Sequence, residues 1–138
     1  MSGEYIPPLE RITGFREDWN SHGTSHPDYF HELRREGEAV CRAGVAPVDY
    51  PIGDHYNSQL RYPNGAARIN YIETREGFER QGFAKELVEH LIKYHRPRQL
   101  VGFSEDADDF WIGIGWTSHY HPEGRSWQTF FTAPTFND

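Results

Sequence analysis

The sequence predicts an α+β fold with a mixed, mostly antiparallel central sheet flanked by about three to four helices. Two observations support this prediction. An apolar strand at 66–73 leads through a glycine-bearing loop into an amphipathic helix at 83–95, and a second strand follows at 99–103. Asn64-Gly65 lies between two alternating runs, which is the strongest short signal for a β-hairpin. With 138 residues, the chain is expected to form one domain, 1–138.

The helix at 83–95 has the clearest pattern in the chain. Its apolar residues recur with the 3.6-residue period of one helix face: Phe83, Leu87, Val88, Leu91 and Ile92. Pro97 ends the helix, because proline cannot continue the hydrogen-bond ladder.

Two elements are predicted before the hairpin signal. Arg11–Phe15 is interpreted as an extended arm or short strand. A helix is predicted from Ser25 to about Arg42, because a cap, a first-turn proline and spaced apolar residues follow one another. Gly37 lies on the apolar face of this helix, and Gly44 is expected to end it.

The remaining elements complete the sheet. Tyr56–Tyr62 is predicted as the first arm of the hairpin that turns at Asn64-Gly65. Ser104 is predicted to cap a short helix that Gly113 and Gly115 end. A second hairpin is predicted from Trp116–Tyr120 and Ser126–Thr132.

Composition excludes several classes of function. The net charge is −7 and there is no long run of Lys and Arg, which argues against binding to nucleic acid or to an anionic membrane. No apolar run is long enough to span a bilayer. The single cysteine, Cys41, predicts a reducing compartment, with the cytosol as the expected location. We interpret Cys41 as a buried thiol on a helix face rather than as a nucleophile.

The loop at 73–82 is the most informative part of the chain for function. A strand, a glycine-bearing loop and a helix N-terminus together aim backbone N–H groups at a phosphate. Gly82 and Ala84 are small, so a ligand could approach the backbone closely. Many such loops bind nothing, and that alternative stays open here.

In order along the chain, these features resemble the GNAT superfamily of acyl-CoA-dependent N-acetyltransferases, most strongly over residues 56–132. The family's Q/R-x-x-G-x-G/A motif aligns with Glu79 to Ala84. A second family pattern, a capped helix followed by a glycine and an aromatic residue, aligns with Phe110 to Trp116. The chain departs from the family in two places, with Glu79 at the first motif position and Trp111 where many members carry a tyrosine acid.

The resemblance implies acetyl-CoA as a co-substrate, with its pyrophosphate on the loop and its pantetheine arm along the preceding strand. The residues that it assigns to the cofactor are Tyr71, Ile72, Thr74, Arg80, Gln81, Gly82, Phe83, Ala84 and Lys85. Arg75 or Arg80 would offset the charge of Glu79. Lys85 and Arg98 are candidate ligands of the outer phosphate, and the alternative is that both are ordinary surface cations.

The resemblance also implies direct transfer of the acetyl group to an amine. Glu73 is the predicted general base, and Tyr120 is the predicted acid, with His119 and His121 as alternatives. No metal is expected.

The acceptor is expected to be an amine of a small molecule or protein, and to be cationic because acids cluster at Glu105–Asp109. The same acids could instead complement a helix dipole. One alternative function is a non-catalytic GNAT-fold protein that senses acyl-CoA or binds proteins, and another is an unrelated α+β binding domain. Whether the protein is a monomer or a homodimer stays open.

Overall fold

A computed structural model describes most of the chain, namely residues 2–5, 12–15, 29–49, 52–53, 56, 62–104, 107–124 and 128–134. The chain divides into two compact units, which are described separately below. The first unit is Met1–Ala46 with Ile69–Tyr94, and the second is Pro47–Arg68 with His95–Asp138.

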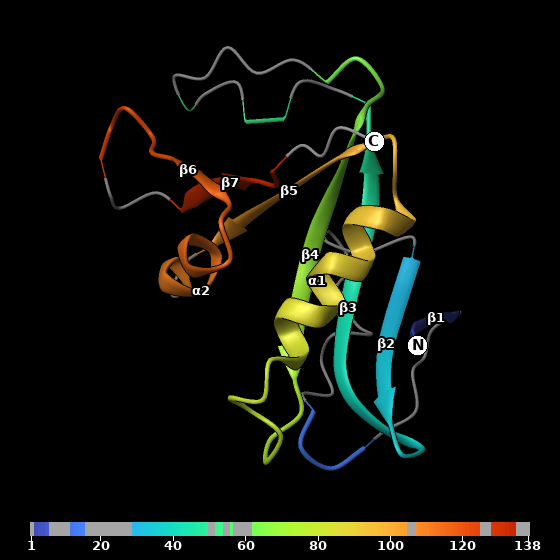
Figure 1. Cartoon of the computed structure of the whole chain (residues 1–138). Helices are drawn as coiled ribbons and strands as arrows, with labels where there is room; N and C mark the ends of the chain where they lie inside the picture. The colour runs from blue at the N-terminus through green and yellow to red at the C-terminus, as the bar shows by residue number, and fades with distance from the viewer. Residues whose placement is uncertain are drawn as a thin grey trace. The chain divides into compact units, whose positions relative to one another are not determined.

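The first unit is a layer of strands covered by one helix. Its strands lie in the order β1 (Ser2–Tyr5), β2 (Tyr29–Arg35), β3 (Glu38–Val48) and β4 (Ala66–Thr74). The pairs β1–β2 and β2–β3 are antiparallel. Helix α1 (Phe83–Tyr94) lies across one face of β2, β3 and β4 (Figure 1).

The core of the first unit confirms the predicted helix face. Leu87, Val88 and Leu91 of α1 are buried, as predicted from their spacing. They belong to the same unit as the buried residues Phe30 and Val40 of the strands. Because the predicted stripe is the buried one, the amphipathic pattern alone was sufficient to orient this helix.

The helix predicted from Ser25 to Arg42 is wrong. Residues 29–48 form the β2–β3 hairpin instead, and 25–28 lie outside the described residues. Glu36 and Gly37 both have positive φ, +52° and +82°, as in the two-residue turns that match strand twist. Strand β3 is buried over almost its whole length, so its apolar residues do not alternate. A continuous apolar run does not distinguish a buried strand from a helix.

Two further predictions fall near the N-terminus and the first hairpin. Residues 12–15 form a turn rather than a strand, closed by the Phe15 N–H donating to the Ile12 carbonyl at 3.2 Å. The predicted turn at Asn64-Gly65 is confirmed, because the Gly65 N–H donates to the Tyr62 carbonyl at 2.9 Å. Most of the predicted strand Tyr56–Tyr62 lies outside the described residues.

The second unit contains β5 (Gln99–Ser104), α2 (Asp108–Gly113), β6 (Thr117–His119) and β7 (Thr129–Thr132). Strand β4, which starts in this unit, is the neighbour of β5. The strands continue in the order β5-β7-β6, and both β5–β7 and β7–β6 are antiparallel pairs. The predicted last hairpin is therefore confirmed.

Side chains cover both faces of the β5-β7-β6 layer. Phe103 and Phe130 are paired in register, and with Val101 and Tyr56 they form the core on one face. On the other face Phe131 packs against Trp111, with ring centroids 6.2 Å apart. Figure 1 shows α2 beside these strands.

The mixed sheet of the predicted fold is confirmed, but the number of helices is not. The described residues contain two helices, α1 and α2, where three to four were expected. Neither of these helices is long and apolar enough to cross a membrane.

Replacing Gly53 with alanine should lower the free energy of unfolding more than replacing Gly37. Both glycines have nearly the same φ, +81° at Gly53 and +82° at Gly37. The backbone strain that a side chain causes, about 1 to 2 kcal/mol, should therefore be the same at each position. At Gly53 the new Cβ would lie 2.4 Å from the Phe130 ring, which adds about 1 to 3 kcal/mol of overpacking. At Gly37 no atom of the part of the chain that the structure describes lies within 4 Å of the new Cβ. Urea unfolding of both variants measures the difference, and equal losses would contradict this packing.

Candidate functional site

The loop between β4 and α1 has an open backbone with three residues at positive φ. These are Gly77 at +96°, Arg80 at +65° and Gly82 at +80°. Helix α1 begins directly after the loop, with the Glu86 N–H donating to the Gly82 carbonyl at 3.0 Å. A Cβ added at Gly82 would meet none of the described residues within 4 Å. The space beside the helix N-terminus is therefore free on that side.

Glu79, the first departure from the family motif, is bonded inside the loop. Its carboxylate accepts the Gly77 N–H at 2.8 Å. A carboxylate that accepts a backbone N–H satisfies a donor of the loop and stabilises its shape. This contact directs the side chain back along the loop, toward Gly77.

Arg75 anchors the start of the loop and does not extend freely toward a ligand. Its Nε donates to the Thr13 carbonyl at 2.9 Å, and its guanidinium also contacts Glu38 at 3.4 Å. The same guanidinium lies 5.3 Å from the centre of the Phe78 ring. Arg75 is therefore a structural residue, and of the two arginines considered to offset Glu79, only Arg80 is exposed.

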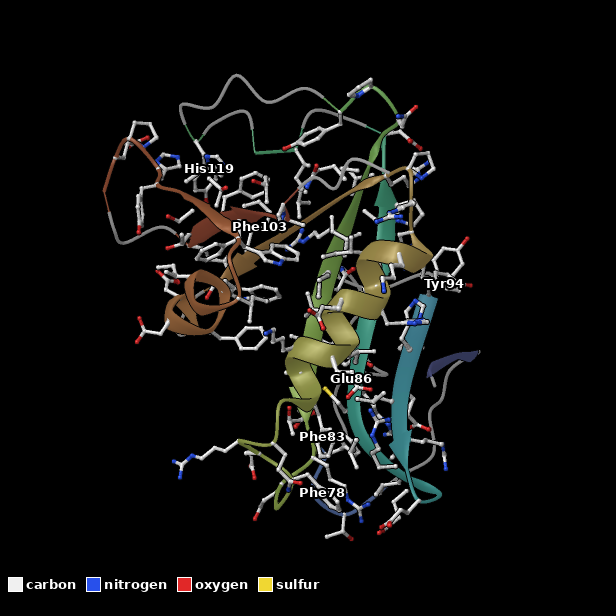
Figure 2. All side chains as sticks on the ribbon, in the orientation of Figure 1. Phe78, Phe83, Glu86, Tyr94, Phe103 and His119 are labelled. Atoms are coloured by element: carbon white, nitrogen blue, oxygen red, sulfur yellow. The ribbon has the colours of Figure 1, made fainter. Side chains whose placement is uncertain are left out.

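Arg35 contacts the first turn of α1, and no sequence pattern predicts this contact. It forms an ion pair with Glu86, and its guanidinium lies 5.7 Å from the centre of the Phe83 ring. Figure 2 shows Phe83 at the start of the helix, with Glu86 one turn further along and Phe78 in the preceding loop. Because Arg35 was assigned to a helix from the sequence, nothing indicated that it would reach α1.

The residues predicted on β4 differ in exposure. Tyr71 is buried and packs against Phe30, and burial raises the pKa of its phenol. Ile72, Glu73 and Thr74 are half-buried. Strand alternation puts Glu73 on the same face as Tyr71. The negative charge of Glu73 contributes to the rise in the pKa of Tyr71.

The predicted residues that follow β4 line the loop and the first turn of α1. Arg80, Gln81, Gly82 and Lys85 are exposed, whereas Phe83 and Ala84 are half-buried. The structure thus places the predicted cofactor residues on one continuous strand–loop–helix segment of the first unit.

The candidates for the acid belong to the second unit. Tyr120 follows β6 and is 40% exposed. His119 Nε2 lies 3.2 Å from the Thr132 hydroxyl, and burial lowers the pKa of the His119 ring. His121 packs edge-on against Tyr56, with ring centroids 5.2 Å apart.

Arg98 of the second unit links two strands through hydrogen bonds. Its guanidinium donates to the Ala66 carbonyl and to the Asp49 carboxylate, each at 3.0 Å, and to the Val48 carbonyl at 3.4 Å. These contacts join the start of β4 to the end of β3. Arg98 is therefore not a free cation for a phosphate.

Trp111, the second departure from the family, belongs to the core. It is 6% exposed, and its ring lies 4.7 Å from that of Trp116. An indole in this position contributes apolar packing and offers no hydroxyl to protonate a thiolate. The hydroxyl of Ser104, the expected cap of α2, accepts the N–H of Ala107, the residue before the helix, at 3.0 Å, and α2 itself has no side-chain cap.

Within the described part of the chain, no three His, Cys, Asp or Glu side chains gather closely enough to hold a metal ion. The acids expected at Glu105–Asp109 are described only in part. Asp108 accepts the Thr129 hydroxyl at 2.7 Å, and Asp109 is exposed.

The sequence profile of the acetyltransferase (GNAT) family matches residues 3–110. Because this match covers most of the chain, the protein belongs to the GNAT acetyltransferase family. No curated protein matches the chain significantly.

Solved structures share this fold at low sequence identity. The crystal structure of the Bacillus subtilis N-acetyltransferase YlbP in complex with coenzyme A aligns with a TM-score of 0.58 and 12% identity. That alignment covers 75% of this chain and 66% of YlbP. A crystal structure described as a bacterial toxin aligns with a TM-score of 0.60 and 14% identity, over 95% of this chain and 88% of the other. At such identities the likeness shows the fold alone.

Cys41 lies on β3 and not on a helix face, but it is buried as predicted. Its Sγ lies 3.7 Å from the Thr74 hydroxyl. Burial raises the pKa of the thiol to about 11, so the thiolate needed for nucleophilic attack is scarce at neutral pH.

Wild-type protein should lose stability relative to Cys41→Ala as the pH rises from 9 to 11. The pKa of the folded thiol, about 11, lies above its usual value of 9.0, so the unfolded state ionises first. Keeping the thiol protonated therefore stabilises the folded wild type fully below pH 9. This contribution to the free energy of unfolding, on the order of 2 kcal/mol, is lost as the pH rises to 11. Urea unfolding of both proteins across this range measures it, because other groups titrate alike in the two. A constant difference would show that the thiol is not shielded from water.

Proposed function

We propose that the protein is an acetyl-CoA-dependent N-acetyltransferase that moves an acetyl group to an amine of a small molecule or protein. The main support is the β4–loop–α1 segment, with its open backbone at Gly82 in the family's motif position. Membership in the acetyltransferase family supports the same conclusion.

The pyrophosphate of acetyl-CoA would bind at the N-terminus of α1. Backbone N–H groups there have no partner inside the helix, and the helix dipole favours an anion. Gly82, Phe83 and Ala84 would present these groups, while Arg80 and Lys85 would supply positive charge. The bond from the Gly77 N–H occupies the Glu79 carboxylate, which reduces its repulsion toward the diphosphate.

The pantetheine arm would pair with the backbone of β4 around Tyr71 to Thr74. A backbone N–H of this stretch would donate to the thioester carbonyl and stabilise the negative charge that develops on its oxygen. This role needs no particular side chain.

The reaction in this proposal is a direct attack. The amine nitrogen forms a bond to the carbonyl carbon of the thioester while Glu73 accepts a proton from the amine. The carbon–sulfur bond then breaks, and the thiolate of coenzyme A takes up a proton, for which Tyr120 is the acid predicted from the sequence. The products are the acetylated amine and free coenzyme A, and exchange with water then removes the proton from Glu73 and restores the proton of the acid.

A non-catalytic acyl-CoA sensor is the second candidate, favoured by the burial of Trp111 at the family's acid position. Both candidates require binding of acetyl-CoA, and only the enzyme turns over an amine. A panel of amines assayed for release of coenzyme A separates them. The location in the cytosol and the oligomeric state stay predictions.

Gly82→Glu should abolish binding of acetyl-CoA with little loss of fold. The new carboxylate would enter the space beside the N-terminus of α1 and repel the diphosphate. Calorimetric titration with acetyl-CoA measures the affinity, with wild-type protein expected to bind in the micromolar range. Gly124→Glu is the control, because Gly124 also has positive φ and open space but lies in the second unit. Unchanged affinity in Gly82→Glu would contradict the assignment of the pyrophosphate.

Glu73→Gln should lower kcat about 10²-fold or more and flatten the pH–rate profile, with the affinity for acetyl-CoA unchanged. The amide keeps the size of the side chain but accepts no proton. Glu76→Gln serves as a control, since Glu76 is exposed and its backbone N–H is bonded to the Gly14 carbonyl. If kcat is the same in Glu73→Gln and wild type, Glu73 is not the base.

A further inference from the structure

The end of the β2–β3 hairpin contacts the proposed cofactor segment both before and after its loop. Arg35 and Glu38 are register partners on either side of the hairpin turn. Glu38 contacts the guanidinium of Arg75 at 3.4 Å, where the loop after β4 begins. Arg35 forms an ion pair with Glu86 in the first turn of α1, where the loop has ended. One hairpin end of the first unit therefore holds both ends of the loop.

Three contacts hold the guanidinium of Arg35. It donates to the Glu86 carboxylate and, at 2.9 Å, to the Arg34 carbonyl, and it lies 5.7 Å from the centre of the Phe83 ring. Figure 2 shows Phe83 and Glu86 at the start of α1. The side chain of Arg35 is 38% exposed and that of Glu86 is 46% exposed, so neither charge is shielded from a ligand in solution.

Glu86 is a carboxylate at the helix end where the proposed site takes an anion from the ligand. Side chains of an α-helix tilt toward its N-terminus. A carboxylate in the first turn therefore interacts with the positive end of the helix dipole, which would also attract the diphosphate. Without a partner, Glu86 would compete with the ligand for this positive potential and would repel it.

No lysine or arginine of α1 is spaced to pair with Glu86. Side chains of a helix meet when they are three or four residues apart. The residues at this spacing are Gly82, Phe83, Glu89 and His90. Burial lowers the pKa of the His90 ring, so this side chain is mostly neutral at pH 7. The cation that pairs with Glu86 comes from outside the helix, and it is Arg35.

Arg35 also changes the charge of the site as a whole. Positions 79 to 86 hold two acids and two bases, so this segment is neutral by itself: Glu79, Arg80, Lys85 and Glu86. The ion pair with Arg35 brings a further positive charge to it. A positive local charge favours the binding of a diphosphate, in a chain whose net charge is −7.

We propose that Arg35 is a positioning residue of the cofactor site, which neutralises Glu86 and so keeps the N-terminus of α1 available to the diphosphate of acetyl-CoA. This inference rests on the binding of acetyl-CoA in the proposed function. Arg35 acts through Glu86 and needs no contact with the ligand. The Gly77 N–H occupies the Glu79 carboxylate in a similar way, so both carboxylates of the segment have a partner in the protein.

A double-substitution cycle at Arg35 and Glu86 tests the inference, with the affinity for acetyl-CoA measured by calorimetric titration at low salt. Arg35→Gln should weaken binding about three- to tenfold, because Glu86 then carries an uncompensated charge. Arg35→Gln together with Glu86→Gln should restore the affinity to within about twofold of wild type. Arg35→Lys should keep most of the affinity, since it retains the charge. Glu86→Gln alone should bind at least as tightly as wild type.

Salt dependence and a matched control separate this role from a purely structural one. The difference in affinity between Arg35→Gln and wild type should shrink as the salt concentration rises toward about 1 M, because salt screens exposed charges. Lys93→Gln is the control. It also removes one exposed positive charge from the first unit, but in the last turn of α1, and should leave the affinity intact.

Each result decides the question. If the doubly substituted protein binds as weakly as Arg35→Gln, or if Glu86→Gln alone weakens binding, the inference is overturned while the proposed function stands. Equal affinities of Arg35→Gln and wild type would overturn it as well. Urea unfolding checks the fold of each variant, and Glu86→Gln decides the question if Arg35→Gln does not fold. Absence of acetyl-CoA binding by the wild type would instead overturn the proposed function.

Discussion

The position of strand β4 is the constraint on which the candidate site depends. In the second unit, Arg98 joins the start of β4 to the end of β3 through the Ala66 and Val48 carbonyls. In the first unit, Arg75 holds the residues that follow β4 by bonding to Thr13 and Glu38. Arginine suits both tasks, because its guanidinium donates in several directions at once. The predicted base and the phosphate loop both depend on this one strand.

The two departures from the family motif have structural explanations. Glu79 would repel a diphosphate if it extended from the loop, but its carboxylate accepts the Gly77 N–H. Trp111 replaces a hydroxyl with an indole, and this indole packs against Trp116 and Phe131 in the core. The first departure therefore preserves the loop, whereas the second removes the family's acid. A binding function needs only the loop, so the departures bear on catalysis more than on recognition of the cofactor.

Sequence patterns were reliable where a segment's structure depends on nearby residues. The spacing of Leu87, Val88 and Leu91 oriented α1, and Asn64-Gly65 located a turn, because both signals act over a few residues. The pattern failed for 29–42, since β3 is buried on both faces and its apolar run resembles a buried helix. The loop residues of the site could be predicted for the same reason as α1. Tyr120 stays a prediction for the acid that no motif supports, because the family's position for it holds a tryptophan, Trp111.

The sequence by itself determined the local elements around the site, namely β4, the loop with its glycines, α1 and β5. Only the tertiary structure decided which arginines hold the fold together, among them Arg35, Arg75 and Arg98. Arg98 and Asp49 are far apart in the chain, as are Arg35 and Glu86, and no local pattern encodes such pairs. Side-chain partners across a sheet depend on strand register and on the burial of both groups, which arise only when the whole chain has folded.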